Sequence, residues 1–130
     1  MQALVIDDSK AMRGILRNML RIIGFTVTEA ENGREGLEAL RRLGRPDVVF
    51  VDWNMPEMSG IEFLRAARAD PAYRSLRVMM ATTETDPAQV ALALEAGADA
   101  HLGKPFTQEA VLRKLQALGV VPGEAGGAVP

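Results

Sequence analysis

The sequence predicts an α/β fold built on a doubly wound, five-stranded parallel sheet. Five short apolar stretches alternate with five stretches that have the periodicity of amphipathic helices, and this alternation is typical of parallel sheets with helices on both faces. Three of the apolar stretches are continuous, as expected of strands that are covered on both sides. Two of these end on aspartates, at the carboxyl ends of strands, where such folds collect their functional groups.

The individual strands and helices follow from local patterns. Strands are expected at residues 3–6, 26–28, 48–51, 77–81 and 100–102. Each strand is followed by a helix, the third over residues 61–69, and glycine or an Asp-Pro pair should end these helices at Gly24, Gly44, Asp70, Gly97 and Gly119. Ser9 is suited to cap the first helix, in which apolar residues recur at intervals of three and four up to Ile23.

The strand order follows from how apolar each strand is. The most apolar strands, at residues 3–6, 48–51 and 77–81, should be central, whereas the alternating or short stretches at residues 26–28 and 100–102 suit the two edges. This gives the order 2-1-3-4-5 of the flavodoxin-like (βα)5 sheet. In that order the ends of strands one and three lie side by side at the point where the winding reverses, which is where ligands bind.

Length and composition indicate one domain. Of the 130 residues, we expect 1–119 to form the folded domain and 120–130 to be a disordered C-terminal tail, because the tail is rich in proline and glycine. The chain contains no cysteine, which excludes disulfides and thiolate-bound zinc and suits a reducing compartment.

The charge balance excludes several classes of partner. Fifteen basic and 17 acidic residues give a net charge of -2, so we expect no general attraction to nucleic acid or to anionic membranes. No basic region precedes an apolar stretch at the N-terminus, and no apolar run approaches the ~18 residues of a membrane span. The sequence therefore predicts a cytoplasmic protein that does not insert into membranes.

Three aspartates are expected to converge at the ends of strands one and three. Asp7 and Asp8 follow the first strand, and Asp52 follows the third. Three carboxylates at close range repel one another unless protons or a cation intervene, and oxygen ligands favour Mg²⁺ or Mn²⁺. We predict Asp8 and Asp52 as direct Mg²⁺ ligands and Asp7 as a ligand through water. A single aspartate at such a position would more often only cap a helix.

Two further side chains should face these acids across the same crevice. Thr82 follows strand four and Lys104 follows strand five. A hydroxyl, an ammonium group and a metal ion can together bind the oxygens of a phosphoryl group, while the Asp52 carboxylate acts as the nucleophile that forms an aspartyl phosphate. Pro105 could provide a cis peptide bond that aims Lys104.

Taken together, these motifs resemble the response regulator receiver family, and within it the CheY-like members. The matching residues are Asp7-Asp8, Asp52-Trp53-Asn54-Met55-Pro56, Gly60, Thr82 and Lys104-Pro105-Phe106. The resemblance covers the chain to about Leu118. Each motif alone is a weak signal, whereas their joint spacing is specific.

The resemblance implies a switch in two-component phosphorelay signalling, of the chemotaxis type. A histidine kinase or phosphotransfer protein would supply a phosphoryl group to Asp52, with Mg²⁺ held by Asp8, Asp52 and the backbone carbonyl of Asn54. Thr82 and Lys104 would then close on the phosphate. The protein would catalyse its own phosphotransfer and dephosphorylation without being a turnover enzyme. It would act as a monomer on a downstream target protein.

The resemblance also implies how the signal is read and how long it lasts. His101 occupies the switch position on strand five, where tyrosine or phenylalanine is more usual, so the strength or pH dependence of the switch stays open. Closure should remodel the face formed by helix four, strand five and helix five. Asn54 and Glu84, two residues after Asp52 and Thr82, should tune hydrolysis of the phosphate. Asn54 and Glu84 could equally be exposed polar residues without a role, and the less favoured interpretation of His101 is a partly exposed edge-strand histidine.

Other classes of protein fit the sequence less well. A docking module that is never phosphorylated is disfavoured by the complete set of Asp8, Asp52, Thr82 and Lys104. A phosphatase of the haloacid dehalogenase type would carry an Asp-x-Asp motif after strand one, which Asp7-Asp8-Ser9 does not match. A flavodoxin would need a phosphate cradle rich in serine, threonine and glycine in the same loop.

Overall fold

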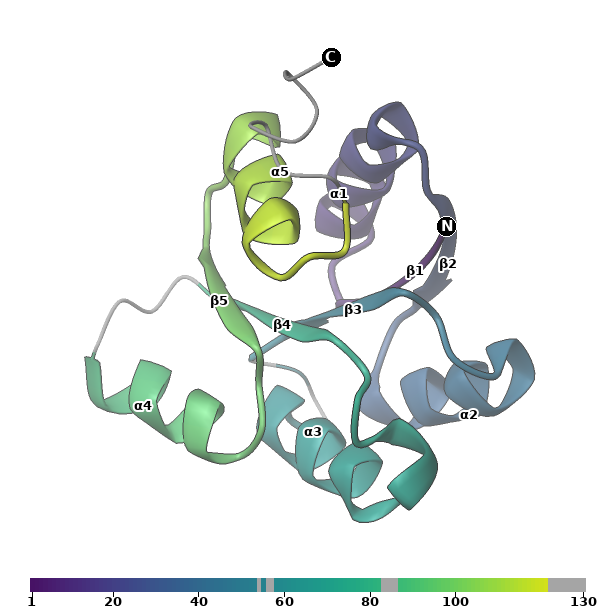
Figure 1. Cartoon of the computed structure of the whole chain (residues 1–130), viewed down its shortest axis with the longest axis vertical. Coiled ribbons are helices and arrows are strands. Elements are labelled where there is room, and N and C mark those ends of the chain that lie inside the picture. The colour runs from purple at the N-terminus through teal and green to yellow at the C-terminus, as the bar shows by residue number, and fades with distance from the viewer. Residues whose placement is uncertain (54, 56–57, 83–86, 122–130) are drawn as a thin grey trace.

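A central parallel sheet organises the chain. The computed structural model describes residues 1–53, 55, 58–82 and 87–121, and within them five strands form one sheet in the order β2-β1-β3-β4-β5. Each neighbouring pair of strands runs parallel. The α/β class, the doubly wound flavodoxin-like arrangement and the strand order 2-1-3-4-5 are confirmed (Figure 1).

The elements alternate along the chain as predicted. The strands are β1 (Gln2–Ile6), β2 (Thr26–Ala30), β3 (Val48–Asp52), β4 (Val78–Thr82) and β5 (Ala100–Gly103). The helices are α1 (Lys10–Ile23), α2 (Gly33–Leu43), α3 (Gly60–Ala69), α4 (Pro87–Glu95) and α5 (Gln108–Ala117). A short 3-10 helix, η1 (Pro71–Tyr73), is an addition to the predicted elements. It forms because proline suits the first position of a helix and Asp70 accepts a hydrogen bond from the Ala72 amide.

Helices cover both faces of the sheet. α1 and α5 lie on one face, and α2, α3 and α4 lie on the other (Figure 1). Alternate residues of β1 divide between the two cores, since Ala3 and Val5 belong to the cluster on the α1 and α5 side, whereas Leu4 and Ile6 belong to the opposite cluster. Burial on both faces explains why the strand sequences are continuously apolar.

The strands differ in burial as their sequences predict. All five residues of β3 and all five of β4 are buried, whereas β2 buries only Ala30 and β5 only Leu102. β2 and β5 are accordingly the edge strands. The apolar strands therefore hold the centre of the sheet, and the two weaker strands close its edges.

The packed part of the chain extends beyond the expected boundary at residue 119. Val121 is buried, and Val120 packs against the same core cluster. The Val120 amide also donates to the Leu115 carbonyl at 3.0 Å. These two apolar residues belong to the domain because they complete the core beside α5. Residues 122–130, which make up the rest of the predicted tail, lie outside the described part of the chain.

Arg68 ties α3 to the loops that lead into β4 and β5. Its guanidinium donates to the Gly97 carbonyl from Nε at 3.1 Å and from Nη2 at 2.8 Å, and to the Tyr73 carbonyl from Nη1 at 2.7 Å. Nη2 also pairs with Asp99 Oδ2 at 3.0 Å, and that oxygen accepts from the Val78 amide at 2.8 Å. One arginine thus provides hydrogen bonds for loop groups outside the sheet ladder and sets the position at which β5 begins.

Ser59 and Glu62 form a capping box at the start of α3, which begins one residue before the predicted residue 61. Ser59 Oγ accepts from the Glu62 amide at 3.3 Å, and the Glu62 carboxylate accepts from the Ser59 amide at 3.0 Å. These hydrogen bonds lower the pKa of the exposed Glu62 carboxyl. Folding therefore favours the charged form, so the contribution to stability is present at neutral pH and is lost as the pH falls through the lowered pKa.

We predict that Glu62→Ala reduces the free energy of unfolding at pH 7, and that its difference from the native protein shrinks as the pH falls below about 4. Ser59→Ala, which removes the N-cap, should cost about 1 kcal/mol. Urea unfolding of the three proteins between pH 7 and pH 3 measures both effects. A Glu62→Ala difference that does not change with pH would contradict a contribution from the charged carboxylate.

Candidate functional site

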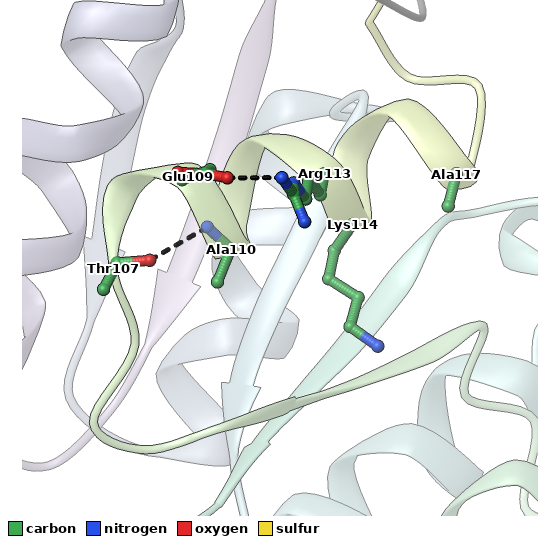
Figure 2. Close-up of a pocket in the computed structure, with 6 residues that line it drawn as sticks. All are labelled: Thr107, Glu109, Ala110, Arg113, Lys114 and Ala117. Carbon is green, nitrogen blue, oxygen red and sulfur yellow. Dashed lines mark hydrogen bonds and ion pairs between the residues drawn. The ribbon is translucent and has the colours of Figure 1, made fainter.

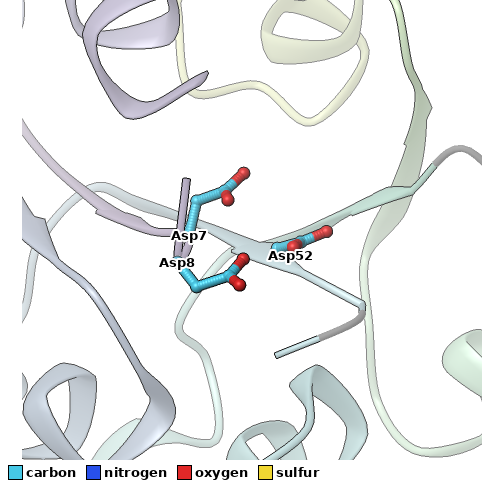
Figure 3. A group of neighbouring side chains, drawn as sticks. All are labelled: Asp7, Asp8 and Asp52. Atoms are coloured by element: carbon cyan, nitrogen blue, oxygen red, sulfur yellow. The ribbon is translucent and has the colours of Figure 1, made fainter. Parts of the chain in front are cut away.

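Three aspartates lie together at the carboxyl ends of β1 and β3. In the parallel register Ile6 pairs with Val51, so the residues that follow them, Asp7 and Asp52, come level with each other. One carboxylate oxygen from each of Asp7, Asp8 and Asp52 lies within 4.8 Å of the others. Figure 3 shows the three side chains gathered at this end of the sheet. The predicted convergence of the acids is present.

This group of donors suits a hard divalent cation. Asp7 and Asp52 are only 6% and 8% exposed, whereas Asp8 is exposed. All three provide carboxylate oxygens, which Mg²⁺ prefers, and the exposure of Asp8 leaves one side of the group open to the waters that Mg²⁺ usually keeps. The residues therefore fit a magnesium ion held partly by protein and partly by water.

Lys104 bridges two of the acids. Its Nζ lies 3.0 Å from Asp7 Oδ2 and 3.0 Å from Asp52 Oδ1. The loop after β5 brings it there, since the Lys104 amide donates to the Thr82 carbonyl at 2.8 Å. The peptide bond between Lys104 and Pro105 is cis. The cis bond that the sequence suggested is present, and the lysine faces the acids as expected.

Burial and charge act on Asp52 and Lys104 in opposite directions. Burial raises the pKa of the Asp52 carboxyl above its usual range, the neighbouring Asp7 and Asp8 add to the rise, and the hydrogen bond from Lys104 only partly offsets it. Burial alone would lower the pKa of Lys104, but its hydrogen bonds to Asp52 and Asp7 raise it overall. With all groups ionised, three negative charges face one positive charge, so an added cation would be stabilising.

Thr82 and His101 come from the neighbouring strands. Thr82 ends β4 and is 2% exposed, and it lies opposite Gly103 in the register. On β5, Ala100 and Leu102 face the core on the α1 and α5 side, so the alternation of the strand turns His101 toward the face that α4 covers. The Nε2 atom of His101 is buried and has no hydrogen-bond partner among the described residues.

Gly60 explains a motif residue that sequence reasoning quoted without a physical role. A Cβ atom at this position would lie 2.3 Å from the backbone oxygen of Asp52, and the Gly60 amide donates to the Trp53 carbonyl at 3.1 Å. The first turn of α3 therefore packs directly on the backbone that carries Asp52. Only a residue without a side chain fits there.

Sequence reasoning missed Arg13, a residue of α1. Its guanidinium donates to the backbone carbonyl of Asp7 and pairs with Glu29 of β2. A single sequence offers no signal for this contact, since Arg17 has the same chemistry one helical turn later. Two predicted site residues, Asn54 and Glu84, lie outside the described residues, so their assignments stay as predictions.

Comparison with known proteins identifies the family. A family model described as the response regulator receiver domain matches residues 3–116. The chain belongs to the response regulator receiver family. Its strand order, 2-1-3-4-5, is the one predicted from the apolar pattern of the strands.

Curated relatives and solved structures place this receiver near chemotaxis proteins. It is 41% identical over 117 residues to the chemotaxis protein CheY1 of Helicobacter pylori strain J99, covering 89% of this chain and 94% of that protein. It is 42% identical over 117 residues to the chemotaxis protein CheY of Pseudomonas aeruginosa, again covering 89% of this chain and 94% of that protein. A structure of Vibrio cholerae CheY4 superposes with a TM-score of 0.85 at 37% identity, covering 90% of this chain and 97% of that one.

Membership defines the general role of this receiver. CheY-like response regulators are signalling proteins of two-component systems that interact with histidine kinases and downstream targets, and receiver domains bind Mg²⁺ at an acidic pocket. In this chain Asp7, Asp8 and Asp52 form an acidic cluster at the carboxyl ends of β1 and β3. Among the described residues, none of the helices has both the length and the apolar character that a membrane span requires.

We predict that Gly60→Ala distorts the site and destabilises the receiver by about 1–3 kcal/mol, because the new methyl group collides with the Asp52 carbonyl. The matched control is Gly14→Ala in α1, where an added Cβ makes only an ordinary contact with Arg17 at 3.6 Å. That change should stabilise the helix by roughly 0.5–1 kcal/mol. Urea unfolding compares the two variants, and equal effects would refute the steric explanation.

Proposed function

We propose that this receiver accepts a phosphoryl group on Asp52 from a histidine kinase or phosphotransfer protein. The observation that carries the proposal is the Asp52 carboxylate, which lies 3.0 Å from the Lys104 ammonium and within 4.8 Å of carboxylate oxygens of Asp7 and Asp8. A nucleophile, a cation and a metal-binding acid pair in one crevice are the parts that phosphoryl transfer needs.

In the proposed reaction, an oxygen of the Asp52 carboxylate attacks the phosphorus of a phosphohistidine. The new O–P bond forms as the P–N bond breaks, and the histidine nitrogen leaves with the bonding electron pair. Asp8 and Asp52 would hold Mg²⁺ directly, Asp7 would hold it through water, and the backbone carbonyl of Asn54 is the remaining proposed ligand. Mg²⁺, when bound, would supply positive charge that offsets the charge on the phosphoryl oxygens, so that the Asp52 carboxylate could approach the phosphorus.

Lys104 and Thr82 are the proposed partners of the transferred phosphate. Lys104 already lies on the Asp52 oxygen, so a phosphoryl group on that oxygen would bring its own oxygens within reach of the ammonium. The Thr82 hydroxyl would donate to another phosphoryl oxygen, and its movement would open space beside His101 on the α4 side of β5. His101 would fill that space, which makes Thr82 and His101 the proposed switch.

The face formed by α4, β5 and α5 is the proposed surface for the target protein. α4 buries only Ala93 among its described side chains, and Leu92 and Leu94 are 46% and 49% exposed. Beside α5 lies an open hollow of about 590 Å³ lined by Thr107, Glu109, Ala110, Arg113, Lys114 and Ala117 (Figure 2). Exposed apolar side chains on α4 and a hollow rimmed by charges beside α5 support binding of another protein.

We also propose how long the aspartyl phosphate lasts and where the receiver works. Asn54 and Glu84 would tune how fast water removes the phosphate, so the receiver would switch itself off without a turnover substrate. We propose that it works as a monomer in the cytoplasm, on protein partners and not on nucleic acid. Its net charge of -2 and its lack of cysteine support these assignments.

The first test uses the fluorescence of Trp53, which adjoins Asp52 and is half-buried. We predict one change in emission on adding Mg²⁺ and a second on adding beryllofluoride, a mimic of the phosphoryl group. Asp52→Ala should abolish the second step because it removes the oxygen to which the mimic binds. Folded native protein that shows no second step would instead favour a docking module that is never phosphorylated.

The variant Lys104→Met separates the two roles proposed for the acids, which are binding Mg²⁺ and accepting the phosphoryl group. Removing the ammonium frees oxygens of Asp7 and Asp52 and removes a repelling charge, so Mg²⁺ should bind tighter by on the order of tenfold. The response to beryllofluoride should be lost, because its fluorine atoms no longer meet an ammonium group. Titrations with Mg²⁺ and with beryllofluoride measure the two effects, and weaker Mg²⁺ binding would contradict the assigned role of the lysine.

A further inference from the structure

Arg13 connects α1 and β2 to the loop that carries the two adjacent acids. We propose that Arg13 is a positioning residue for the magnesium site, because it fixes the peptide group between Asp7 and Asp8. The inference rests on the proposed Mg²⁺ site, and it concerns a residue that does not itself touch the ion. Removal of Arg13 should weaken Mg²⁺ binding even though it removes a positive charge.

The contacts of Arg13 form a clamp. Its Nη1 donates to the backbone oxygen of Asp7 at 2.6 Å, and its Nε donates to Glu29 Oε1 at 3.2 Å. The side chain is only 12% exposed, and its hydrogen bond to the Asp7 carbonyl is partly buried, whereas the one to Glu29 is exposed. Glu29 also pairs through its other carboxylate oxygen with Arg17, whose Nη1 lies 3.0 Å from Glu29 Oε2. The guanidinium is therefore anchored on β2 before it reaches the loop.

Asp7 is restrained at each of its polar groups. Its amide donates to the Ala30 carbonyl at 3.1 Å, and its carboxylate accepts from the Ser9 amide at 2.8 Å and pairs with Lys104. Its carbonyl is the group that Arg13 holds. Loss of Arg13 would leave that carbonyl without a protein donor among the described residues.

The position of Asp8 depends on the peptide group between Asp7 and Asp8. Its side chain is exposed and accepts no hydrogen bond from the described residues, so its own contacts do not fix its direction. The Asp7 carbonyl and the Asp8 amide share one rigid plane. Holding that carbonyl therefore fixes the position of the Asp8 Cα atom. Arg13 thus orients a proposed direct ligand through the backbone, as outer partners orient ligands in other metal sites.

Considered by its charge alone, removal of Arg13 should strengthen Mg²⁺ binding. A guanidinium near three carboxylates repels an incoming cation, so neutralising it should strengthen Mg²⁺ binding. Positioning predicts weaker binding, because the loop would have to be ordered when the ion arrives. The sign of the change therefore separates the two explanations.

The experiment compares Arg13→Met with Arg17→Met. Both changes remove one positive charge from Glu29, but only Arg13 reaches the Asp7 carbonyl. Mg²⁺ titrations followed by Trp53 fluorescence should give about tenfold weaker binding for Arg13→Met, the lower end of the range for outer partners. Arg17→Met should bind as the native protein does or slightly more tightly. Binding by Arg13→Met that is unchanged or tighter would overturn the proposal.

A second readout needs no metal. Amide hydrogen exchange, measured by NMR without Mg²⁺, reports the Asp7 and Ser9 amides that hydrogen-bond around the loop. In Arg13→Met these amides should exchange faster, while amides in β3 exchange as in the native protein. Unchanged loop exchange would refute the clamp, and faster exchange in β3 as well would reduce Arg13 to a general structural role.

The two readouts also separate this inference from the proposed function. Native protein that binds no Mg²⁺ would reject the proposed metal site, while the exchange data would still decide whether Arg13 orders the loop. Arg13→Lys gives a graded comparison, because lysine keeps the charge but has no planar fork with which to reach both Glu29 and Asp7. It should bind Mg²⁺ with intermediate affinity.

Discussion

The ammonium group of Lys104, held between Asp7 and Asp52, is the interaction on which the site depends. Asp7 follows β1, Asp52 ends β3 and Lys104 follows β5, so one charged group links the ends of three strands. Burial of the two carboxylates would be unfavourable without it. The pairing still leaves an excess of negative charge once Asp8 is counted, which explains how one crevice can hold its shape and also attract a divalent cation.

The winding of the sheet supplies the rest of the geometry. β1 and β3 are neighbours although β2 lies between them in sequence, and this brings Asp7 level with Asp52. The backbone around each acid is then held from outside the sheet, since Arg13 of α1 clamps the Asp7 carbonyl and Gly60 of α3 packs on the Asp52 carbonyl. The backbone of both acids is therefore held by contacts with α1 and α3, while their carboxylates face a crevice that is open at Asp8.

The molecule is less tightly packed toward the proposed target face. β3 and β4 are buried along their whole length, but β5 buries only Leu102 and α4 buries only Ala93 among the described side chains. Segments with few buried contacts are the ones that rearrange at low cost. His101, with a buried ring nitrogen that has no partner among the described residues, lies on this side. A change of charge at Asp52 would thus act on a part of the fold that has few buried side chains.

Local pattern alone determined the fold and the identity of the acids, because continuous apolar runs report burial on both faces and their last residues mark the carboxyl end of the sheet. The predicted strand order and the convergence of Asp7, Asp8 and Asp52 follow from that rule. Tertiary structure decided the Arg13 clamp, the close approach of Gly60 to Asp52, and the packing of Val121 into the core. These features join residues that are distant in the chain or chemically ordinary in it, so only the packed molecule distinguishes Arg13 from Arg17.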